Sequence, residues 1–180
     1  MNMLDMTEWR TVSPYDFDEN IFHMIDREWM LVTAKHPQND GVNTMTASWG
    51  GCGILWNKPV AFVFIRPQRY TYAFTEAAPS LTLSFFGEEY RDALRFCGTA
   101  SGRDGDKFAQ TGLHPAEIGN TAAPREARVI FVCRKLYADR LQENAFVDTQ
   151  MLSHYKNGDY HKMYICEIEK ILVRDGASQD

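Results

Sequence analysis

Short strand-like runs fill most of this chain of 180 residues, and they restrict it to a mainly β fold. Runs rich in β-branched and aromatic residues predict strands at 29–34, 43–49, 59–65, 80–86, 127–141 and 160–173. Helical segments are expected between them at 18–26, 70–77, 88–97, 106–111 and 148–156. Since helices and strands do not alternate strictly, the order favours an antiparallel barrel over a parallel sheet. A barrel would also remove the exposed edges that such apolar strands would otherwise present.

The remaining segments are expected to be irregular. Residues 1–13 form a polar lead-in that Met6 and Trp9 could anchor. Proline, asparagine and glycine predict turns at 35–41, where His36 is expected to be a surface side chain, and at 156–159, and the two prolines of 114–125 predict a long irregular section. The glycines at 50, 51 and 53 predict a bend, a bulge or a close approach of the backbone to another group.

Composition indicates one domain, residues 1–180, with 44% hydrophobic residues and a formal net charge of -5. That charge disfavours nucleic acid as a partner, because nucleic-acid affinity depends on clustered cations. No apolar run reaches the roughly 20 residues that span a bilayer, and the first residues do not resemble a signal peptide. Without an export signal, the four dispersed cysteines are expected to be reduced thiols in the cytoplasm, and their spacing does not predict a metal site.

The stretch from Gly41 to Tyr72 is unusually rich in small hydrogen-bond donors and cations. Its donors are Asn43, Thr44, Thr46, Ser48 and Thr71, and its cations are Arg66 and Arg69. A second donor-rich loop at 98–108 carries Arg103 and Lys107. The start of a helix near Thr71 would favour an anion, because its backbone N–H groups are free. These blocks predict a site for a phosphate and a ring, although a solvated set of surface charges would also account for the cations.

Four blocks carry a family resemblance, and they read Asn43-Thr44-Met45-Thr46-Ala47-Ser48-Trp49, Arg66-Pro67-Gln68-Arg69-Tyr70-Thr71, Phe96-Cys97-Gly98 and Ser101-Gly102-Arg103-Asp104-Gly105-Asp106-Lys107-Phe108. In this order and spacing they resemble the flavin reductase-like, FMN-binding split-barrel family, near its flavoredoxin branch. The resemblance implies a homodimer of split β-barrels with FMN bound non-covalently at the subunit interface. It also implies NAD(P)H as the electron donor.

The resemblance implies roles for individual residues. The phosphate would be held by the group Arg69, Thr71, Ser101, Gly102 (through its backbone) and Lys107. Thr46, Ala47, Ser48 and Trp49 would line the ring, while Asn43 and Met45 would contact the ribityl chain or the ring face. The predicted site also includes Thr44, Cys52, Arg66, Gln68, Tyr70 and Cys97.

Several of these assignments have simpler alternatives. Met45 and Ala47 could instead face the barrel interior, and Cys52 could be an ordinary buried thiol. His161 could lie close to the flavin or serve as a structural residue at a strand end. Lys107 is expected at the surface, so its replacement by alanine should weaken FMN binding and leave the fold intact.

The function that this sequence favours is that of an NAD(P)H-dependent flavin oxidoreductase. Hydride transfer is the flavin's own chemistry, so it requires no catalytic residue of the protein, and the sequence offers no nucleophile or catalytic dyad. The alternative is a non-catalytic, flavoredoxin-like FMN protein that docks a redox partner. A structural dimer without cofactor is a third hypothesis, against which the donor-rich blocks argue.

Overall fold

The computed structural model describes residues 1–39 and 41–176. Its main element is an eight-stranded sheet in which every strand pairing is antiparallel. The strands along its path lie in the order β3-β2-β6-β9-β10-β5-β4, and β1 pairs with β10. Their bounds are β1 Trp9–Val12, β2 Met30–Lys35, β3 Val42–Ala47, β4 Gly50–Leu55, β5 Lys58–Ile65, β6 Ser80–Phe85, β9 Val129–Arg140 and β10 Lys162–Arg174. Two further strands, β7 Pro115–Ile118 and β8 Thr121–Pro124, form a separate hairpin.

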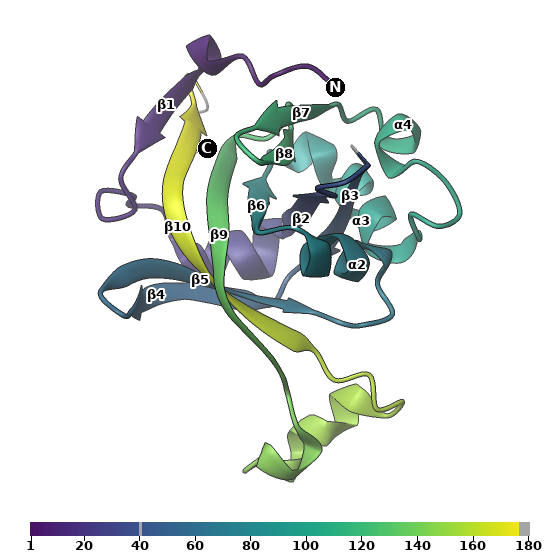
Figure 1. The fold of residues 1–180 in the computed structure, drawn as a ribbon. Coiled ribbons are helices and arrows are strands. Elements are labelled where there is room, and N and C mark those ends of the chain that lie inside the picture. Colours follow the sequence, from purple (N-terminus) through teal and green to yellow (C-terminus); the bar gives the residue numbers. More distant parts are fainter. Residues whose placement is uncertain (40, 177–180) are drawn as a thin grey trace.

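Strand β10 connects the parts of the sheet. Along one edge it pairs with β9, and along the other it pairs first with β5 and then, from Ile171 to Arg174, with β1. Register shifts between Ile165 and Cys166 and between Ile168 and Lys170 interrupt its pairing with β9. Such irregularities bend a strand and increase its twist. They let β10 pair along one edge with both β5 and β1, which run in different directions (Figure 1).

Two apolar cores lie on the two faces of the sheet. One core includes Met30, Val63, Phe85, Phe131 and Tyr164. The other core joins side chains of the sheet to the helices and to the β7–β8 hairpin, and it includes Leu31, Leu94, Phe108, Ala116 and Ile130. Leu31 and Met30 are neighbours in β2 but belong to different cores, as the period of two in a strand requires.

The helices of the body cover only part of the sheet. Helices α2, α3 and α4 lie on the same side of the molecule (Figure 1), next to the edge strand β3. Their bounds are α2 Tyr70–Ala77, α3 Arg91–Thr99 and α4 Lys107–Thr111. A short α1, Ile21–His23, continues into the π-helical turn η2, Met24–Glu28, and the 3-10 turns are η1 Met6–Glu8, η3 Glu88–Tyr90, η4 Glu143–Ala145 and η5 Thr149–Tyr155.

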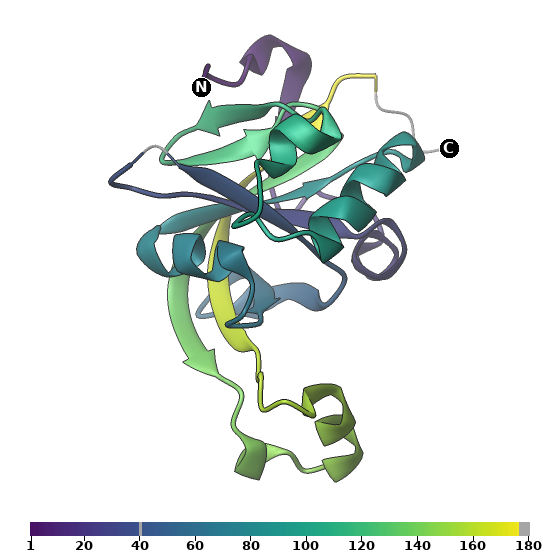
Figure 2. The same ribbon diagram turned by 90° about the vertical axis from the view of Figure 1, so that its right-hand side faces the viewer.

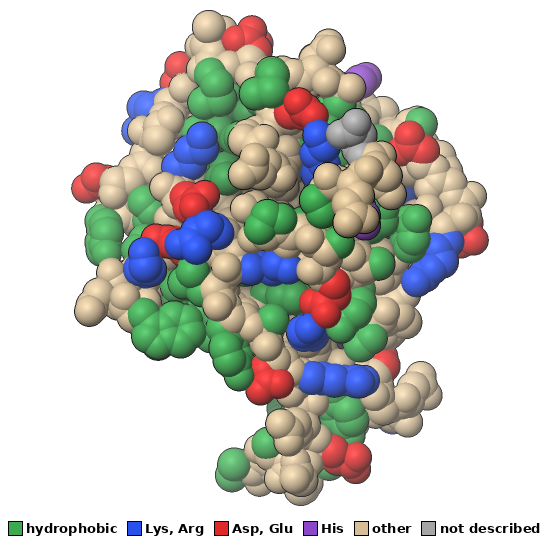
Figure 3. All heavy atoms as spheres, viewed as in Figure 1, with side chains coloured by type: hydrophobic (Ala, Val, Ile, Leu, Met, Phe, Trp, Pro, Cys, Tyr) green, Lys and Arg blue, Asp and Glu red, His purple; other side chains and the backbone are tan. Residues whose placement is uncertain are grey.

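The chain between β9 and β10 forms an arm that projects from the body. We define the arm as residues 141–161, which include η4 and η5. It extends away from the sheet in both ribbon views (Figure 1 and Figure 2), and the space-filling view shows it as a narrow projection (Figure 3). Stacked aromatic side chains give it internal order, since the Tyr155 and Tyr160 ring centroids lie 5.0 Å apart.

The predicted mainly β, antiparallel fold is confirmed, with each predicted strand and helix found within a few residues of its expected position. The sheet, however, is not closed. In the described part of the chain, β3 and β4 end the sheet and no strand pairing joins them. The expectation that barrel closure removes the sheet edges was therefore wrong.

Of the three alternatives predicted for the glycine cluster, the structure shows a close approach of the backbone and not a bend. Gly50–Leu55 is strand β4, whose pairing with β5 includes Cys52 opposite Ala61. The tight turn comes later, at Trp56 and Asn57, where both residues have positive φ as the common two-residue hairpin turn requires. A close approach is present at Gly50, where a Cβ would lie 2.7 Å from the Phe62 carbonyl oxygen.

Two further segments differ from expectation. The section at 114–125 is the β7–β8 hairpin, in which Pro115 faces Pro124 at the open end. The lead-in contains β1, and Trp9 is an anchor as predicted, whereas Met6 is exposed. Asp40, in the predicted turn at 35–41, and residues 177–180 of the predicted domain lie outside the described residues. No helix in the described ranges is long and apolar enough to cross a membrane.

Candidate functional site

The N-terminus of α2 has no side-chain cap. Arg69 is its N-cap residue, and neither its side chain nor another makes a capping hydrogen bond there. The first turn of α2 contains no acidic residue. Free backbone N–H groups and the positive end of the helix dipole favour an anion at such a position.

Two segments approach this helix end closely. Asn43 of β3 is buried and donates its Nδ2 hydrogen to Thr71 Oγ1 at 2.8 Å. The loop between α3 and α4, residues 100–106, comes so near that a Cβ on Gly102 would lie 2.3 Å from Asn43 Oδ1 and 2.7 Å from Tyr70 Cδ1. Only glycine fits at position 102 without displacing these neighbours, so the loop backbone lies directly against the start of α2.

Two cations lie beside the same loop. Arg69 donates to the carbonyl oxygens of Gly98 (2.5 Å) and Cys97 (2.9 Å). Lys107 Nζ donates to the carbonyl oxygens of Thr44 (2.9 Å) and Cys97 (3.1 Å). Burial, and then the charge of Arg69, lower the pKa of Lys107 to about 8. Burial also lowers the pKa of Arg69.

These contacts have a structural role as well. Cys97 and Gly98 belong to the last turn of α3, whose carbonyl groups have no partner within the helix, and cations stabilise that end. Among the described residues, no carboxylate forms an ion pair with Arg69 or Lys107. Within the described ranges, carbonyl dipoles are therefore the partners of these two formal positive charges.

A groove of about 740 Å³ lies near the other end of β3. Most of its lining is apolar, and it includes Ile21, Phe22 and Ile25 from the α1 region together with Ser48, Trp49, Gly51 and Cys52. Trp49 is 46% exposed, and its ring lies 5.4 Å, centroid to centroid, from both His154 and His161. The six residues of β3 link this groove to the helix end, a span of about 17 Å at ~3.4 Å per residue.

The comparisons with known proteins agree with this architecture. A family model described as a flavin reductase like domain matches residues 22–180. The chain belongs to this family. The resemblance predicted from the four sequence blocks is thus confirmed. A search of curated proteins with this sequence found no match.

Solved structures of the flavin reductase-like family share the fold. A flavoredoxin of Desulfovibrio vulgaris (Miyazaki F) is 22% identical, with a TM-score of 0.65 over 84% of this chain and 72% of that one. An FMN-binding domain of a flavin reductases-like enzyme from Shewanella baltica OS155 is 13% identical, with a TM-score of 0.64 over 92% of this chain and 77% of that one. Component B of nitrilotriacetate monooxygenase from Bacillus cereus is 14% identical, with a TM-score of 0.65 over 95% and 84%. The predicted split-barrel fold class is confirmed, in an open form.

The predicted site residues of this flavin reductase-like chain fall into four groups, of which Arg66 and Gln68 at the arm are the last. The helix end gathers Asn43, Arg69, Tyr70, Thr71, Cys97, Ser101, Gly102 and Lys107. The groove gathers Ser48, Trp49 and Cys52. The intervening β3 carries Thr44, Met45, Thr46 and Ala47.

The side chains on the two faces of β3 make different contacts. Met45 and Ala47 pack into an apolar core, which matches the simpler of the two predictions for them. On the other face, Thr44 bonds Thr33 Oγ1 (2.9 Å), and Thr46 donates to the Leu94 carbonyl oxygen of α3 (2.5 Å). The β3 side chains thus hold the strand in place.

Lys107 differs most from expectation. It was predicted at the surface, and that was wrong: it is only 4% exposed. It is the first residue of α4, whose N-cap Asp106 accepts from Phe108 N at 2.9 Å. This geometry directs the long side chain inward, between β3 and the end of α3.

Arg66 and Gln68 contact the arm. Arg66 forms an ion pair with Asp159 and donates to the His154 carbonyl oxygen (3.0 Å), and Gln68 Nε2 donates to Asp159 at 2.7 Å. The Gln68 carbonyl oxygen in turn accepts from Arg103 (3.1 Å). Sequence reasoning did not assign Asp159 or His154, because nothing local marks a turn aspartate or an arm histidine as a partner of a loop far away in the chain.

Two groups considered for redox or proton chemistry are held in uncharged forms at neutral pH. Burial raises the pKa of the Cys52 thiol to about 11. Burial, together with the charge of Arg66, lowers the pKa of His161 to about 4. His161 accepts or donates through Nδ1 to the Tyr155 hydroxyl at 2.9 Å. It also packs against the Trp49 ring beside the groove, so its position fits both alternatives predicted for it.

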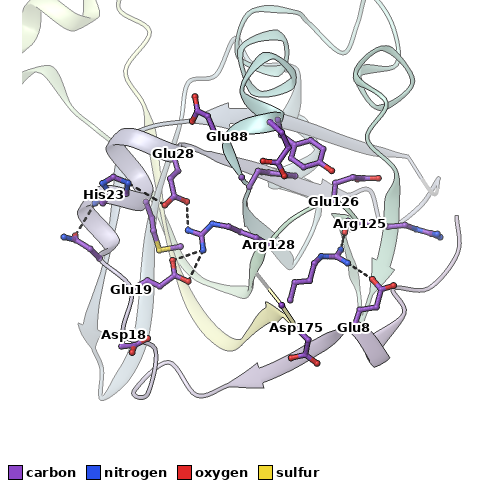
Figure 4. A pocket seen from close by; sticks show the side chains of 18 residues that line it. Glu8, Asp18, Glu19, His23, Glu28, Glu88, Arg125, Glu126, Arg128 and Asp175 are labelled. Atoms are coloured by element: carbon purple, nitrogen blue, oxygen red, sulfur yellow. Dashed lines mark hydrogen bonds and ion pairs between the residues drawn. The ribbon is translucent and has the colours of Figure 1, made fainter. Parts of the chain in front are cut away.

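A larger cavity, of about 1220 Å³, lies elsewhere (Figure 4). Acidic side chains dominate it, and Arg128 at its centre pairs with Glu19 (2.8 Å) and Glu28 (2.5 Å). It contains none of the predicted cofactor residues, and carboxylates would repel a phosphate. No cluster of three or more His, Cys, Asp or Glu suited to a metal occurs in the described ranges.

Proposed function

We propose that this chain is an FMN-binding flavoprotein that takes electrons from NAD(P)H and passes them to free flavin or another acceptor. The observation that carries the proposal is the partly buried Arg69 and the buried Lys107, which have no carboxylate partner among the described residues and lie beside the start of α2, where no side chain caps the helix. Burying a charge is costly unless it is paired. A phosphate dianion would supply the missing countercharge, and charge-assisted hydrogen bonds to it are strong.

The phosphate would lie at the N-terminus of α2. Its partners would be the backbone of Thr71 and Gly102, the hydroxyl of Ser101 and the guanidinium of Arg69. Lys107 would contribute positive charge from the interior side of this site. Arg103, whose guanidinium carbon lies 5.0 Å from the Tyr70 ring centroid, closes the outer side of this site.

The flat ring would occupy the apolar groove beside Ser48 and Trp49. The β3 strand would guide the polyol chain between the two ends, with Asn43 nearest the phosphate. This arrangement uses backbone groups after Ala47 for the polar edge of the ring and side chains of α1 for its apolar face. A solved structure with the same fold is named as an FMN-binding domain, which supports FMN as the ligand.

FMN, when bound, would supply the hydride chemistry, so the protein needs only to bind, orient and exclude water. The neutral states of Cys52 and His161 agree with that division. Trp49 would limit access of water to one side of the groove. No side chain of the protein is required to transfer a proton in this proposal.

A second copy of the chain is the proposed main partner. Phe22 is 87% exposed beside the groove, and Ile54 and Trp56 are exposed on the β4–β5 hairpin. Large exposed apolar surface of this kind usually marks an interface. A homodimer would cover it and would enclose the groove.

The test begins with the visible spectrum of the purified protein and a titration of flavin-free protein with FMN and with riboflavin. We expect about one FMN per chain and much weaker binding of riboflavin. NADH and NADPH, added separately without oxygen, should bleach the flavin spectrum. Bleaching by dithionite alone would favour the electron carrier instead, and absence of FMN binding would refute the flavoprotein proposal.

A further inference from the structure

We propose that Arg128 is a positioning residue, which holds the segment 20–28 in a fixed place beside β4 and thereby sets the width of the apolar groove. This inference rests on the proposed function, because it assigns how the ring end of that site is kept in shape. It also gives a role to the acidic cavity of Figure 4, which the proposed function leaves unused.

The segment 20–28 separates the groove from the acidic cavity. The groove lies between this segment and residues 48–52, so its width depends on where the segment lies. In the described part of the chain the segment joins no strand pairing, and the sheet does not fix it through a ladder of hydrogen bonds. Asn20 lines both hollows, Ile21, Phe22 and Ile25 line the groove, and His23, Met24 and Glu28 line the cavity.

Arg128 ties both ends of this segment to the sheet. Its backbone N–H donates to the Phe85 carbonyl oxygen at 2.8 Å, and its carbonyl oxygen accepts from the Arg174 N–H at 2.9 Å, so β6 and β10 fix its backbone on both sides. The guanidinium then reaches Glu19 at 2.8 Å, just before the N-cap of α1, and Glu28 at 2.5 Å, the last residue of η2 (Figure 4). One side chain on a rigid strand end therefore holds the beginning and the end of the segment.

The end of the segment is held in a strained conformation. The turn η2 is π-helical, a rare form that is often found at functional sites. Trp29, which follows it, has φ 68° and ψ 170°, a conformation that is costly for any residue except glycine and persists only where the surroundings enforce it. Arg91 donates to the carbonyl oxygens of Arg27 (2.7 Å) and Glu28 (3.1 Å), and its guanidinium carbon lies 4.5 Å from the Trp29 ring centroid. Glu28 thus receives both arginines, and loss of one of them would let the segment relax.

Apolar contacts alone do not determine where the segment lies. Met24 and Ile25 anchor it in the core, but apolar attraction is non-directional. The ion pairs of Arg128 are directional, and the side chains that make them are largely buried. Buried ion pairs often add little net stability compared with apolar side chains of the same size, so their effect here is to select one position of the segment.

A simpler alternative is that these ion pairs only stabilise the fold, and two variants separate the alternatives. Arg128→Met leaves Glu19 and Glu28 without their arginine, which is strongly destabilising for a buried pair. The triple variant Glu19→Gln/Glu28→Gln/Arg128→Met removes all three charges together, so that no charge is left unpaired. Arg134→Met is the matched control, because Arg134 of β9 also pairs with two glutamates, both on β10, and lines neither hollow.

The experiment measures three quantities for these variants. Hydrogen exchange of residues 20–29 in flavin-free protein should become at least about tenfold faster in both Arg128 variants and stay unchanged in Arg134→Met. The dissociation constants of FMN and riboflavin should rise about tenfold in both Arg128 variants, by similar factors, because the ring is common to the two ligands. The midpoint of thermal unfolding should fall in Arg128→Met and stay near the native value in the triple variant.

Unchanged exchange of residues 20–29 in Arg128→Met would overturn the inference, and so would a loss of affinity confined to FMN. A triple variant that matches the native protein in exchange and affinity would show that the ion pairs only stabilise the fold, which also overturns it. If the native protein binds neither flavin, the proposed function fails, whereas the exchange measurement still decides whether Arg128 positions the segment.

Discussion

Replacing Gly102 by alanine tests the geometry of the proposed phosphate site directly. The new Cβ would lie 2.3 Å from Asn43 Oδ1 and 2.7 Å from Tyr70 Cδ1. Asn43 cannot move aside without cost, because it is buried and its amide donates to Thr71. The loop must therefore lift away from the start of α2, or the Asn43–Thr71 bond must break.

Forced overpacking of this kind costs about 1–3 kcal/mol. At about 2–4 °C per kcal/mol for a chain of this size, the midpoint of thermal unfolding should fall by roughly 2–12 °C. The FMN dissociation constant should rise by about tenfold or more, since loss of about 1.4 kcal/mol of binding free energy corresponds to that factor. Riboflavin affinity should change much less, because riboflavin has no phosphate.

Gly53→Ala is the matched control. Its new Cβ would meet only the Phe62 ring, with the nearest atom at 3.8 Å, which is ordinary contact. Thermal unfolding and fluorescence titration of both variants would be compared with the native protein. If Gly102→Ala behaves like Gly53→Ala in both assays, the loop does not lie where the phosphate site requires it.

Three further predictions concern the groove and the arm. Trp49→Ala should weaken FMN and riboflavin binding by similar factors, measured by fluorescence titration, because Trp49 lines the ring end; a loss confined to FMN would contradict this. His161 has a pKa of about 4 in the folded protein and about 6.5 in the unfolded chain. Its contribution to the free energy of unfolding is therefore fully present above pH 6.5 and is lost as the pH falls toward 4. Between pH 7 and pH 4.5 the native protein should lose up to about 3 kcal/mol of its free energy of unfolding through His161, and the His161→Gln variant should not. Urea denaturation of both proteins at the two pH values measures this difference, and an unaltered pH dependence in the variant would refute the lowered pKa of His161. Asp159→Asn removes the carboxylate that holds Arg66 and Gln68, so limited proteolysis between 141 and 161 should accelerate; equal cleavage rates would show that other contacts hold the arm.

The sequence predicted the strands of the core well because their signals are local. Val60 to Ile65 and Val129 to Cys133 are runs rich in β-branched and aromatic residues, and both are strands in which most side chains are buried. The strand Gly50–Leu55 was not predicted, because glycine in an isolated stretch indicates a break in a strand. Its strand conformation comes from pairing with β5, which no local pattern can report.

The same limit applied to the candidate site. The donor-rich blocks identified which segments meet, and the structure brings Asn43, Thr71 and Gly102 together. The inward course of Lys107 depends on how α4 sits beside β3, and the partner of Arg66 lies about ninety residues away. A lysine directly after an aspartate N-cap is the only hint of that inward course, and it is a weak one.

The bond from Lys107 to Thr44 has a consequence for how copies of this chain meet at high concentration. An unpaired strand edge is a template on which another chain can add a strand. On β3 that template is interrupted, because the Lys107 ammonium group donates to the Thr44 carbonyl oxygen and α3 lies alongside the strand. On β4 the α1 region lies beside Gly50–Cys52, but no side chain is described as bonding to the outer backbone groups of β4, which is rich in small residues that a second backbone can approach. We therefore expect any self-association through strand addition to start at β4, and a charged residue at position 54, whose side chain is already exposed, is the first change to make against it.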